Sequence, residues 1–201
     1  MSRWRASPRQ LATLLAGLWL FGAGEGLLVA SELGNSPWTV LAEGAADQTG
    51  LGIGTTTVAI SFVILALWIP LRERPGLGTV LNAILVGVAL GVTVELVPDL
   101  ENLAARGAEV VAGIGLVALG SGLYLMTRLG AGPRDGLMLG LHRRTGLSVR
   151  LVRTTIESTA VLAGFLLGGT VGIGTLAFAL GIGPAVQAAL GVLSSTPAHE
   201  L

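Results

Sequence analysis

The sequence predicts an all-α polytopic membrane protein. We expect about six transmembrane helices in two inverted-topology repeats, each with three spans and a short interfacial or re-entrant helix. The 201 residues are 52% hydrophobic and 12% charged, with a mean hydropathy of +0.77, whereas soluble domains carry about 25% charged residues. Apolar runs of about 20 residues, long enough to cross a bilayer, alternate with short polar segments. The chain also matches itself at an offset of 96 residues.

The internal match predicts two repeats, residues 1–100 and residues 101–201. Between Gly17 and Ala89, 21 of 73 positions are identical to the residue 96 positions later. A chain this rich in Leu, Gly and Ala would match itself at roughly a tenth of its positions by chance. The matched residues are mostly Gly, Pro and Thr, which punctuate secondary structure. We therefore expect the two copies to share a fold.

The first repeat is predicted to hold three spans, at residues 11–30, 51–70 and 78–97. The first span follows three arginines and resembles a signal peptide. We expect it to be retained, because it is the counterpart of the span that precedes Leu129. Ser36 and Pro37 are typical of a helix start and predict a short helix over 36–48 that cannot cross a bilayer.

The second repeat is predicted to hold spans at residues 110–126, 149–167 and 173–193. A short helix over 133–144, starting at Pro133, matches the short helix of the first repeat. Pro184 lies inside the last span and is expected to kink or break it.

The arginines predict the topology. An N-terminus in the cytoplasm puts most of them on the cytoplasmic side, as membrane proteins prefer. These are Arg3, Arg5, Arg9, Arg72, Arg74, Arg128, Arg134, Arg143, Arg144 and Arg150. Both chain ends are then cytoplasmic. Because each repeat has three spans, the second copy enters the membrane inverted, which is a recurring transporter architecture.

Two paired motifs carry a family resemblance. The Leu-Gly-x-x-Pro segments at 33–37 and 129–133, and the Gly-x-Gly-Thr segments at 76–79 and 172–175, resemble those of YczE/YitT-type bacterial membrane proteins. The resemblance extends to a set of second-half residues, Pro133, Asp135, Arg153, Glu157, Gly172, Gly174, Thr175 and Gly183-Pro184. It is stronger to the YczE branch, because we expect no C-terminal soluble domain. It implies a protein of the bacterial inner membrane and supplies no substrate.

The candidate substrate-binding residues begin with Arg153 and Glu157. They lie one helical turn apart on one face of a predicted span and can pair. We expect them to form part of a substrate site between the repeats. The alternative is an ion pair that only fixes helix register or reaches the membrane surface. Glu25 lies past the middle of the first span, and the alternative for it is an interfacial position.

The other candidates lie at helix starts. Gly78-Thr79 and Gly174-Thr175 open two spans, where free N–H groups suit an anion. The alternative is that they only form the turn and the cap. Asp135 is a further candidate, although a carboxylate is favourable in a first helical turn without any function. The arginines near it are interpreted as anchors to anionic lipid.

Composition excludes several kinds of chemistry. The chain has no Cys and no Lys, and its two histidines have no partner at metal-ligand spacing. We therefore expect no enzyme activity, no cofactor, no metal and no nucleic-acid partner. The sequence favours a small transporter or permease for an unknown small molecule or ion. The alternative is a non-transporting accessory protein that supports a membrane-associated partner or a lipid process. Either is compatible with a homodimer in the bilayer.

Overall fold

A computed structural model describes residues 3–195, which form eight α-helices and no strand. The helices are α1 (Pro8–Ala30), α2 (Pro37–Thr49), α3 (Ile53–Leu71), α4 (Leu77–Leu96), α5 (Leu103–Met126), α6 (Pro133–Thr145), α7 (Val149–Leu166) and α8 (Ile173–Ser195). Five of them, α1, α3, α4, α5 and α8, are long and apolar enough to cross a membrane. The sixth predicted span is α7, which has 18 residues and carries three charged side chains.

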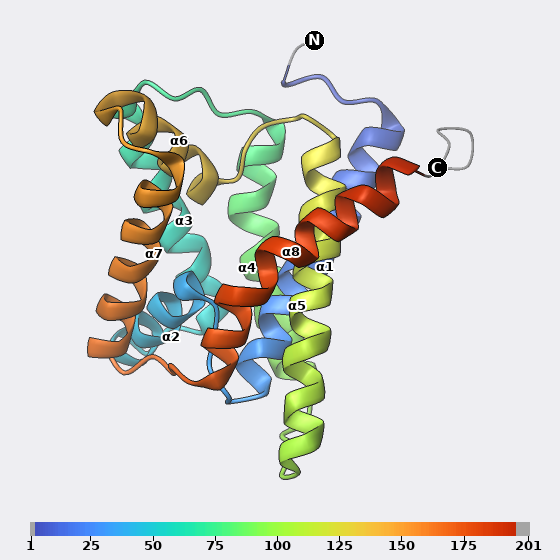
Figure 1. Cartoon of the computed structure of the whole chain (residues 1–201), viewed down its shortest axis with the longest axis vertical. Helices are drawn as coiled ribbons and strands as arrows, with labels where there is room; N and C mark the ends of the chain where they lie inside the picture. The colour runs from blue at the N-terminus through green and yellow to red at the C-terminus, as the bar shows by residue number, and fades with distance from the viewer. Residues whose placement is uncertain (1–2, 196–201) are drawn as a thin grey trace.

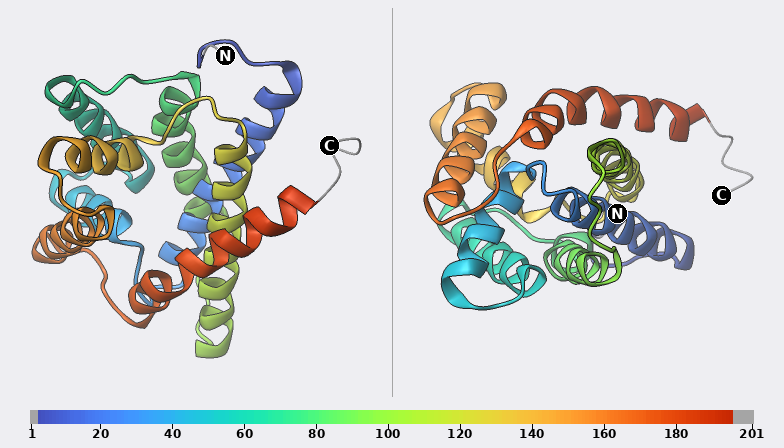
Figure 2. Two further views of the ribbon diagram at one scale, coloured as in Figure 1. Left: turned by 45° about the horizontal axis from the view of Figure 1, so that its top comes forward. Right: turned by 90° about the horizontal axis from the view of Figure 1, so that it is seen from below.

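The helices form two bundles, and each bundle takes two helices from each half of the chain. In one bundle α1 packs against α4 and α5, and α5 packs against α8. In the other, α2 packs against α3 and α7, while α6 packs against α3 and α7. Contacts between α3 and α4 join the bundles. The two groups stand side by side in Figures 1 and 2, with the short helices α2 and α6 at opposite ends of the second bundle.

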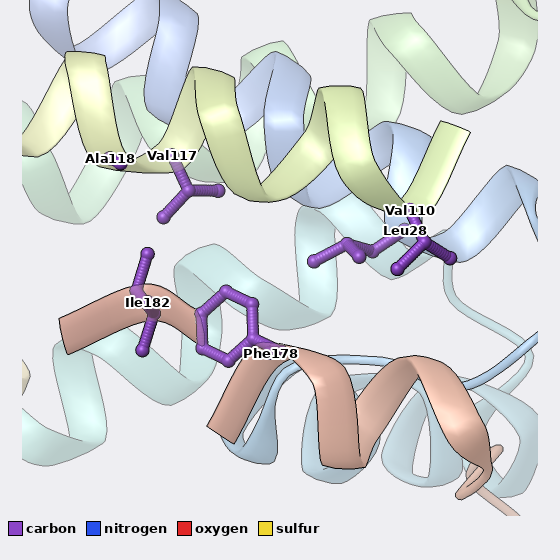
Figure 3. Close-up of a cluster of buried hydrophobic side chains, with 6 residues drawn as sticks. All are labelled: Leu28, Val110, Val117, Ala118, Phe178 and Ile182. Carbon is purple, nitrogen blue, oxygen red and sulfur yellow. The ribbon is translucent and has the colours of Figure 1, made fainter. Parts of the chain in front are cut away.

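Glycines bring α1 and α5 together at two levels. A Cβ added to Gly17 would lie 2.9 Å from the carbonyl oxygen of Gly120, and one added to Gly24 would lie 2.6 Å from that of Gly113. Such close backbone approach is typical of membrane helices with small residues at the contact. An apolar cluster extends this core from α1 and α5 to α8 and includes Leu28, Val117 and Phe178 (Figure 3).

Each half of the chain closes a helix start of the other half. The amide of Gly78, at the start of α4, donates to the carbonyl of Leu129 at 3.0 Å. The amide of Gly174, at the start of α8, donates to the carbonyl of Leu33 at 2.8 Å. Adding 96 to one partner and subtracting 96 from the other converts the first bond into the second. The Gly17–Gly120 and Gly24–Gly113 contacts interconvert in the same way.

Left-handed backbone positions also pair at this offset. Glu32 and Arg128 have φ of 51° and 55°, and Gly50 and Gly146, which end the two short helices, have φ of 71° and 73°. The remaining positive-φ residues of the described chain are Gly34 with Gly130 and Arg72 with Gly168. Every such turn in the described residues therefore has a partner 96 residues away.

The predicted boundaries need three corrections. The helix α5 begins at Leu103, about two turns before the predicted start at 110, because Asn102 caps it by accepting from the amide of Ala104. The helix α8 runs through Pro184 without a break. Membrane helices tolerate proline where neighbouring groups satisfy the freed backbone. The short helices begin at Pro37 and Pro133 and end one residue later than predicted. The predicted cytoplasmic C-terminus lies outside the described residues.

Candidate functional site

The carboxylate of Glu25 is buried where α1 meets the start of α2. Its side chain is 1% exposed. It accepts hydrogen bonds from the hydroxyls of Ser36 at 2.6 Å and Thr39 at 2.7 Å. Ser36 occupies the N-cap position of α2, yet its side chain does not cap that helix and donates to Glu25 instead. Glu25 is therefore enclosed by the protein in this fold.

The second half reverses this arrangement of acid and hydroxyl. Here the acid is on the short helix, where Asp135 lies in the first turn of α6. The hydroxyl is on the long helix, where Tyr124 of α5 donates to Asp135 at 2.5 Å. Tyr124 is buried, and its ring meets Phe21 of α1 edge to face. Each half thus ties its short helix to its long helix through one carboxylate.

The guanidinium of Arg134, at the start of α6, packs against the start of α2. It stacks over the ring of Trp38, 5.4 Å from the centroid, which is a cation–π contact. The carboxylates of Glu25, Asp135 and Glu157 all act electrostatically on it. The interpretation of Arg134 as a lipid anchor is therefore wrong, because its charge is directed into the protein. Trp38 and Arg134 are 96 residues apart and occupy equivalent positions in the two halves.

Arg153 and Glu157 form the predicted ion pair on α7. The Nε of Arg153 donates to Glu157 at 2.8 Å. The pair is not enclosed by protein, since the side chains are 51% and 32% exposed. The pair lies at the edge of the second bundle. The Glu157 carboxylate acts electrostatically on Arg134 and also lines a cavity.

This cavity has a volume of about 560 Å³ and lies between α7 and α8, next to Pro37 at the start of α2. Glu157, Thr154 and Ser158 line it from α7, and Thr175 lines it from α8. The remaining lining residues are apolar, namely Pro37, Val161, Leu162, Phe165, Val171 and Ala179. We call it the α7–α8 cavity. Figure 1 shows the two helices diverging, with α7 upright and α8 inclined across α5.

Glycines close the equivalent helix pair of the first half, α3 and α4. A Cβ on Gly54 of α3 would lie 2.5 Å from the carbonyl oxygen of Gly87 of α4, so the two backbones touch. The residue 96 positions after Gly54 is Arg150, which is exposed on α7. An arginine cannot enter a backbone contact of this kind. Helices α7 and α8 consequently do not pack along their lengths as α3 and α4 do.

The threonines at the helix starts have local partners. The hydroxyl of Thr79 accepts from the amide of Gly76 at 3.1 Å, and that of Thr175 accepts from the amide of Gly172 at 3.3 Å. The amides of Gly78 and Gly174 are already bonded to Leu129 and Leu33. These amides are thus engaged by the protein itself, and Thr175 also lines the α7–α8 cavity. Within residues 3–195, no three side chains of His, Cys, Asp or Glu gather as metal ligands would.

Sequence reasoning missed three residues of this centre, which are Trp38, Tyr124 and Arg134. Arg134 lies in a polar, arginine-rich short helix, which is typical of a membrane surface. The repeat offset carried the information needed, because it places Arg134 on Trp38 and Asp135 on Thr39. Residues at equivalent positions of two copies can meet where a two-fold axis relates the copies and both residues lie close to it.

Comparison with known proteins identifies the group to which this arrangement belongs. A family of unknown function (DUF6198) matches residues 8–190, which include both short helices and the whole charged centre. The chain belongs to this family. Membership of DUF6198 agrees with the resemblance to YczE-like proteins, since YczE is among the relatives found.

Three relatives of this DUF6198 protein are similar over most of their length. An uncharacterized protein of Haemophilus influenzae is 44% identical over 196 residues, which is 98% of this chain and 90% of the relative. The uncharacterized membrane protein YczE of Bacillus subtilis is 32% identical, covering 82% of this chain and 78% of its own. The uncharacterized protein YyaS of the same organism is 29% identical, with 80% and 82% covered. No solved structure matches the chain. The DUF6198 chain is thus a multi-pass membrane protein.

Proposed function

We propose that this protein is a small transporter or permease of the bacterial inner membrane, with its substrate site between two inverted repeats. The repeats would comprise residues 1–100 and 101–201, with both chain ends in the cytoplasm. Such transporters bind substrate where the two repeats meet, next to discontinuous helical segments.

Three kinds of contact support the inverted repeats. The glycine contacts of α1 with α5 interconvert at the 96-residue offset with the partners exchanged. The bonds from Gly78 to Leu129 and from Gly174 to Leu33 do the same. Trp38 meets its own counterpart Arg134. Reciprocal contacts of this kind are expected where a two-fold axis relates the two copies.

The observation that carries the proposal is the α7–α8 cavity. Its walls come from α7 and α8 of the second repeat and, at Pro37, from the first repeat, and they include Glu157. Arg150 of α7 stands where the first half has the closely packed Gly54. The cavity volume of about 560 Å³ is within the size range of small-molecule sites, which are mostly apolar with a few placed polar groups. The cavity opens between two helices, so a substrate would enter from the side or from the membrane surface.

The charges at the centre favour a cation or a proton as the transported or coupled species. Three carboxylates, of Glu25, Asp135 and Glu157, face two guanidiniums, of Arg134 and Arg153. The ionised set therefore has one negative charge in excess. Intramembrane acids of this kind are typical of ion and proton pathways.

A charge swap tests the site. The double variant Arg153→Glu with Glu157→Arg keeps the pair but moves each charge by about one helical turn, roughly 5–6 Å. We expect it to fold with little change in melting temperature, because the side chains are partly exposed. We also expect it to lose the thermal stabilisation that a screen of small organic and inorganic cations gives the wild type. A swapped protein that keeps the full ligand response would exclude the pair from the site.

The alternative is an accessory protein that supports a membrane-associated partner or a lipid process. One observation favours it. Only 11% of the most apolar stretch of α8 is buried within the chain, against 33–44% for the other four candidate spans. A partner helix, or a second copy of this chain, would bury more of α8. Cross-linking from Leu176 or Leu180, both exposed on α8, distinguishes the two. A single stoichiometric protein partner, with no ligand response in the screen, would favour the accessory role.

A further inference from the structure

A second cavity, of about 570 Å³, lies at the end of the molecule near the N-terminus and away from the α7–α8 cavity. Five arginines and one glutamate line it, together with Leu71 and Gly140. The charged residues are Arg3, Arg72, Glu73, Arg74, Arg143 and Arg144. They come from the chain before α1, the turn between α3 and α4, and the last turn of α6. With all six ionised, the wall has a net charge of +4.

Local structure holds several of these side chains in place. Arg144 donates to the carbonyl of Pro70 at 2.7 Å, and Arg3 donates to the carbonyl of Arg74 at 3.3 Å. Arg143 pairs with Glu73. Arg72 ends α3 in a left-handed conformation with φ of 57°, which turns the chain at the rim of the cavity. The arginines therefore converge on one space and do not spread over the surface.

The equivalent region of the other half is neutral to acidic. Positions 96 residues after Arg72, Glu73 and Arg74 hold Gly168, Gly169 and Thr170. Thr170 is bonded through its amide and its hydroxyl to Glu43. Positions 96 residues before Arg143 and Arg144 hold Asp47 and Gln48. The repeat fold alone therefore does not require arginines here.

We propose that this basic cavity binds a phosphate-bearing anion. Guanidinium groups recognise phosphate oxygens through paired, charge-assisted hydrogen bonds. Several of them around one cavity match a doubly or triply charged group better than a carboxylate. The volume accommodates a phosphate with an attached group, which is either a lipid headgroup or a soluble phosphate compound. This site does not depend on the proposed transport function.

The preference of membrane proteins for arginine on the cytoplasmic side offers a simpler origin for these charges. That preference depends on the side of the membrane on which an arginine lies, and not on whether several arginines line one space. It therefore predicts that any two arginines at this end of the molecule contribute equally to anion binding. Arg9 and Arg128 supply the comparison, because both are exposed near this end and neither lines the cavity.

The experiment uses full-length protein in nanodiscs of phosphatidylcholine, with inorganic pyrophosphate titrated by calorimetry. A second arm measures retention of phosphatidylglycerol by native mass spectrometry. We expect Arg72→Gln with Arg74→Gln to weaken binding at least tenfold in one arm, and Arg9→Gln with Arg128→Gln to change it less than twofold. Melting temperatures confirm folding. If the double variant Arg72→Gln with Arg74→Gln does not fold, the single variants Arg74→Gln and Arg144→Gln are measured in its place.

The two arms identify the source of the phosphate. Pyrophosphate binding that phosphatidylglycerol does not compete away assigns a soluble compound. Retention of phosphatidylglycerol without pyrophosphate binding assigns a lipid headgroup. The proposal is overturned if the wild type binds neither probe, or if both double variants lose binding to the same extent.

Discussion

Trp38 and Arg134 occupy equivalent positions in the two halves of the chain and are stacked on each other, 5.4 Å from cation to ring centroid. In the first half Glu25 is held by hydroxyls at the start of α2, and in the second half Asp135 is held by Tyr124. The same place in the fold thus holds an aromatic ring in one copy and a cation in the other. The pair joins the two halves and also holds the positive charge at the centre.

Removal of the Arg134 charge should destabilise the protein. Arg134→Gln removes the cation that acts electrostatically on the carboxylates of Glu25 and Asp135. Breaking a fully buried pair costs roughly 3–5 kcal/mol, and for this partly exposed group we expect about 2 kcal/mol. Thermal unfolding in detergent measures the loss. Arg128→Gln, at an exposed position, is the control, and equal melting temperatures for the two variants would contradict a central role for Arg134.

Glu25 should matter more than Glu95. Glu25→Ala leaves the hydroxyls of Ser36 and Thr39 without their acceptor, at a cost of roughly 1–3 kcal/mol for each buried group. Glu95 is exposed on α4, so Glu95→Ala should change stability by about 0.5 kcal/mol or less. Once a ligand is known, its effect on Glu25→Gln is compared with its effect on Glu95→Gln. Equal tolerance in both stability and ligand response would remove Glu25 from the site.

The open and closed helix pairs should respond differently to a larger side chain. Ala83 of α4 is completely buried, and its counterpart 96 residues later, Ala179 of α8, lines the α7–α8 cavity. Ala83→Leu should cost roughly 1–3 kcal/mol through overpacking. Ala179→Leu should leave the melting temperature unchanged and reduce ligand stabilisation, because it fills the cavity. Destabilisation by both variants to the same extent would mean that α7 and α8 close on each other in the membrane.

Topology can be measured directly with reporter tags. Tags after Arg74 and near Arg143 should report the cytoplasm, and tags near Asp47 and Asp99 should report the outside. The basic cavity brings Arg74 and Arg143 to the same end of the molecule, because the two long helices between them, α4 and α5, take the chain away from that end and back again. Opposite locations for the tags at Arg74 and Arg143 would rule out the inverted repeat.

Helix positions were predictable because they depend on local sequence. Proline after Leu-Gly starts both short helices, glycine at 50 and 146 ends them, and the apolar runs fix the long helices. The weak point was α7, where Arg150, Arg153 and Glu157 interrupt an apolar run of only 18 residues. Its ion pair was predicted correctly, since a spacing of four suffices for it. That the pair lies at the edge of a bundle depends on packing, which spacing does not reveal.

The centre of the molecule was harder to predict because it is built from tertiary contacts. Tyr124 reaches Asp135 and Arg134 reaches Trp38 only after the short helices fold back against the long ones. The α7–α8 cavity depends on one difference between the copies, Gly54 against Arg150. This difference is visible in the aligned repeats, and its consequence follows from the absence of a Cβ at Gly54.

The crossed bonds from Gly78 to Leu129 and from Gly174 to Leu33 set an order of events during synthesis. Chains are made from the N-terminus, so the carbonyl of Leu33 lacks its hydrogen-bond donor until the ribosome adds Gly174 near the end of translation. Until then the first half carries a backbone acceptor without its partner from the second half. Truncated chains that stop before Gly172 retain this defect, and membrane quality-control proteases would meet them as unfinished molecules.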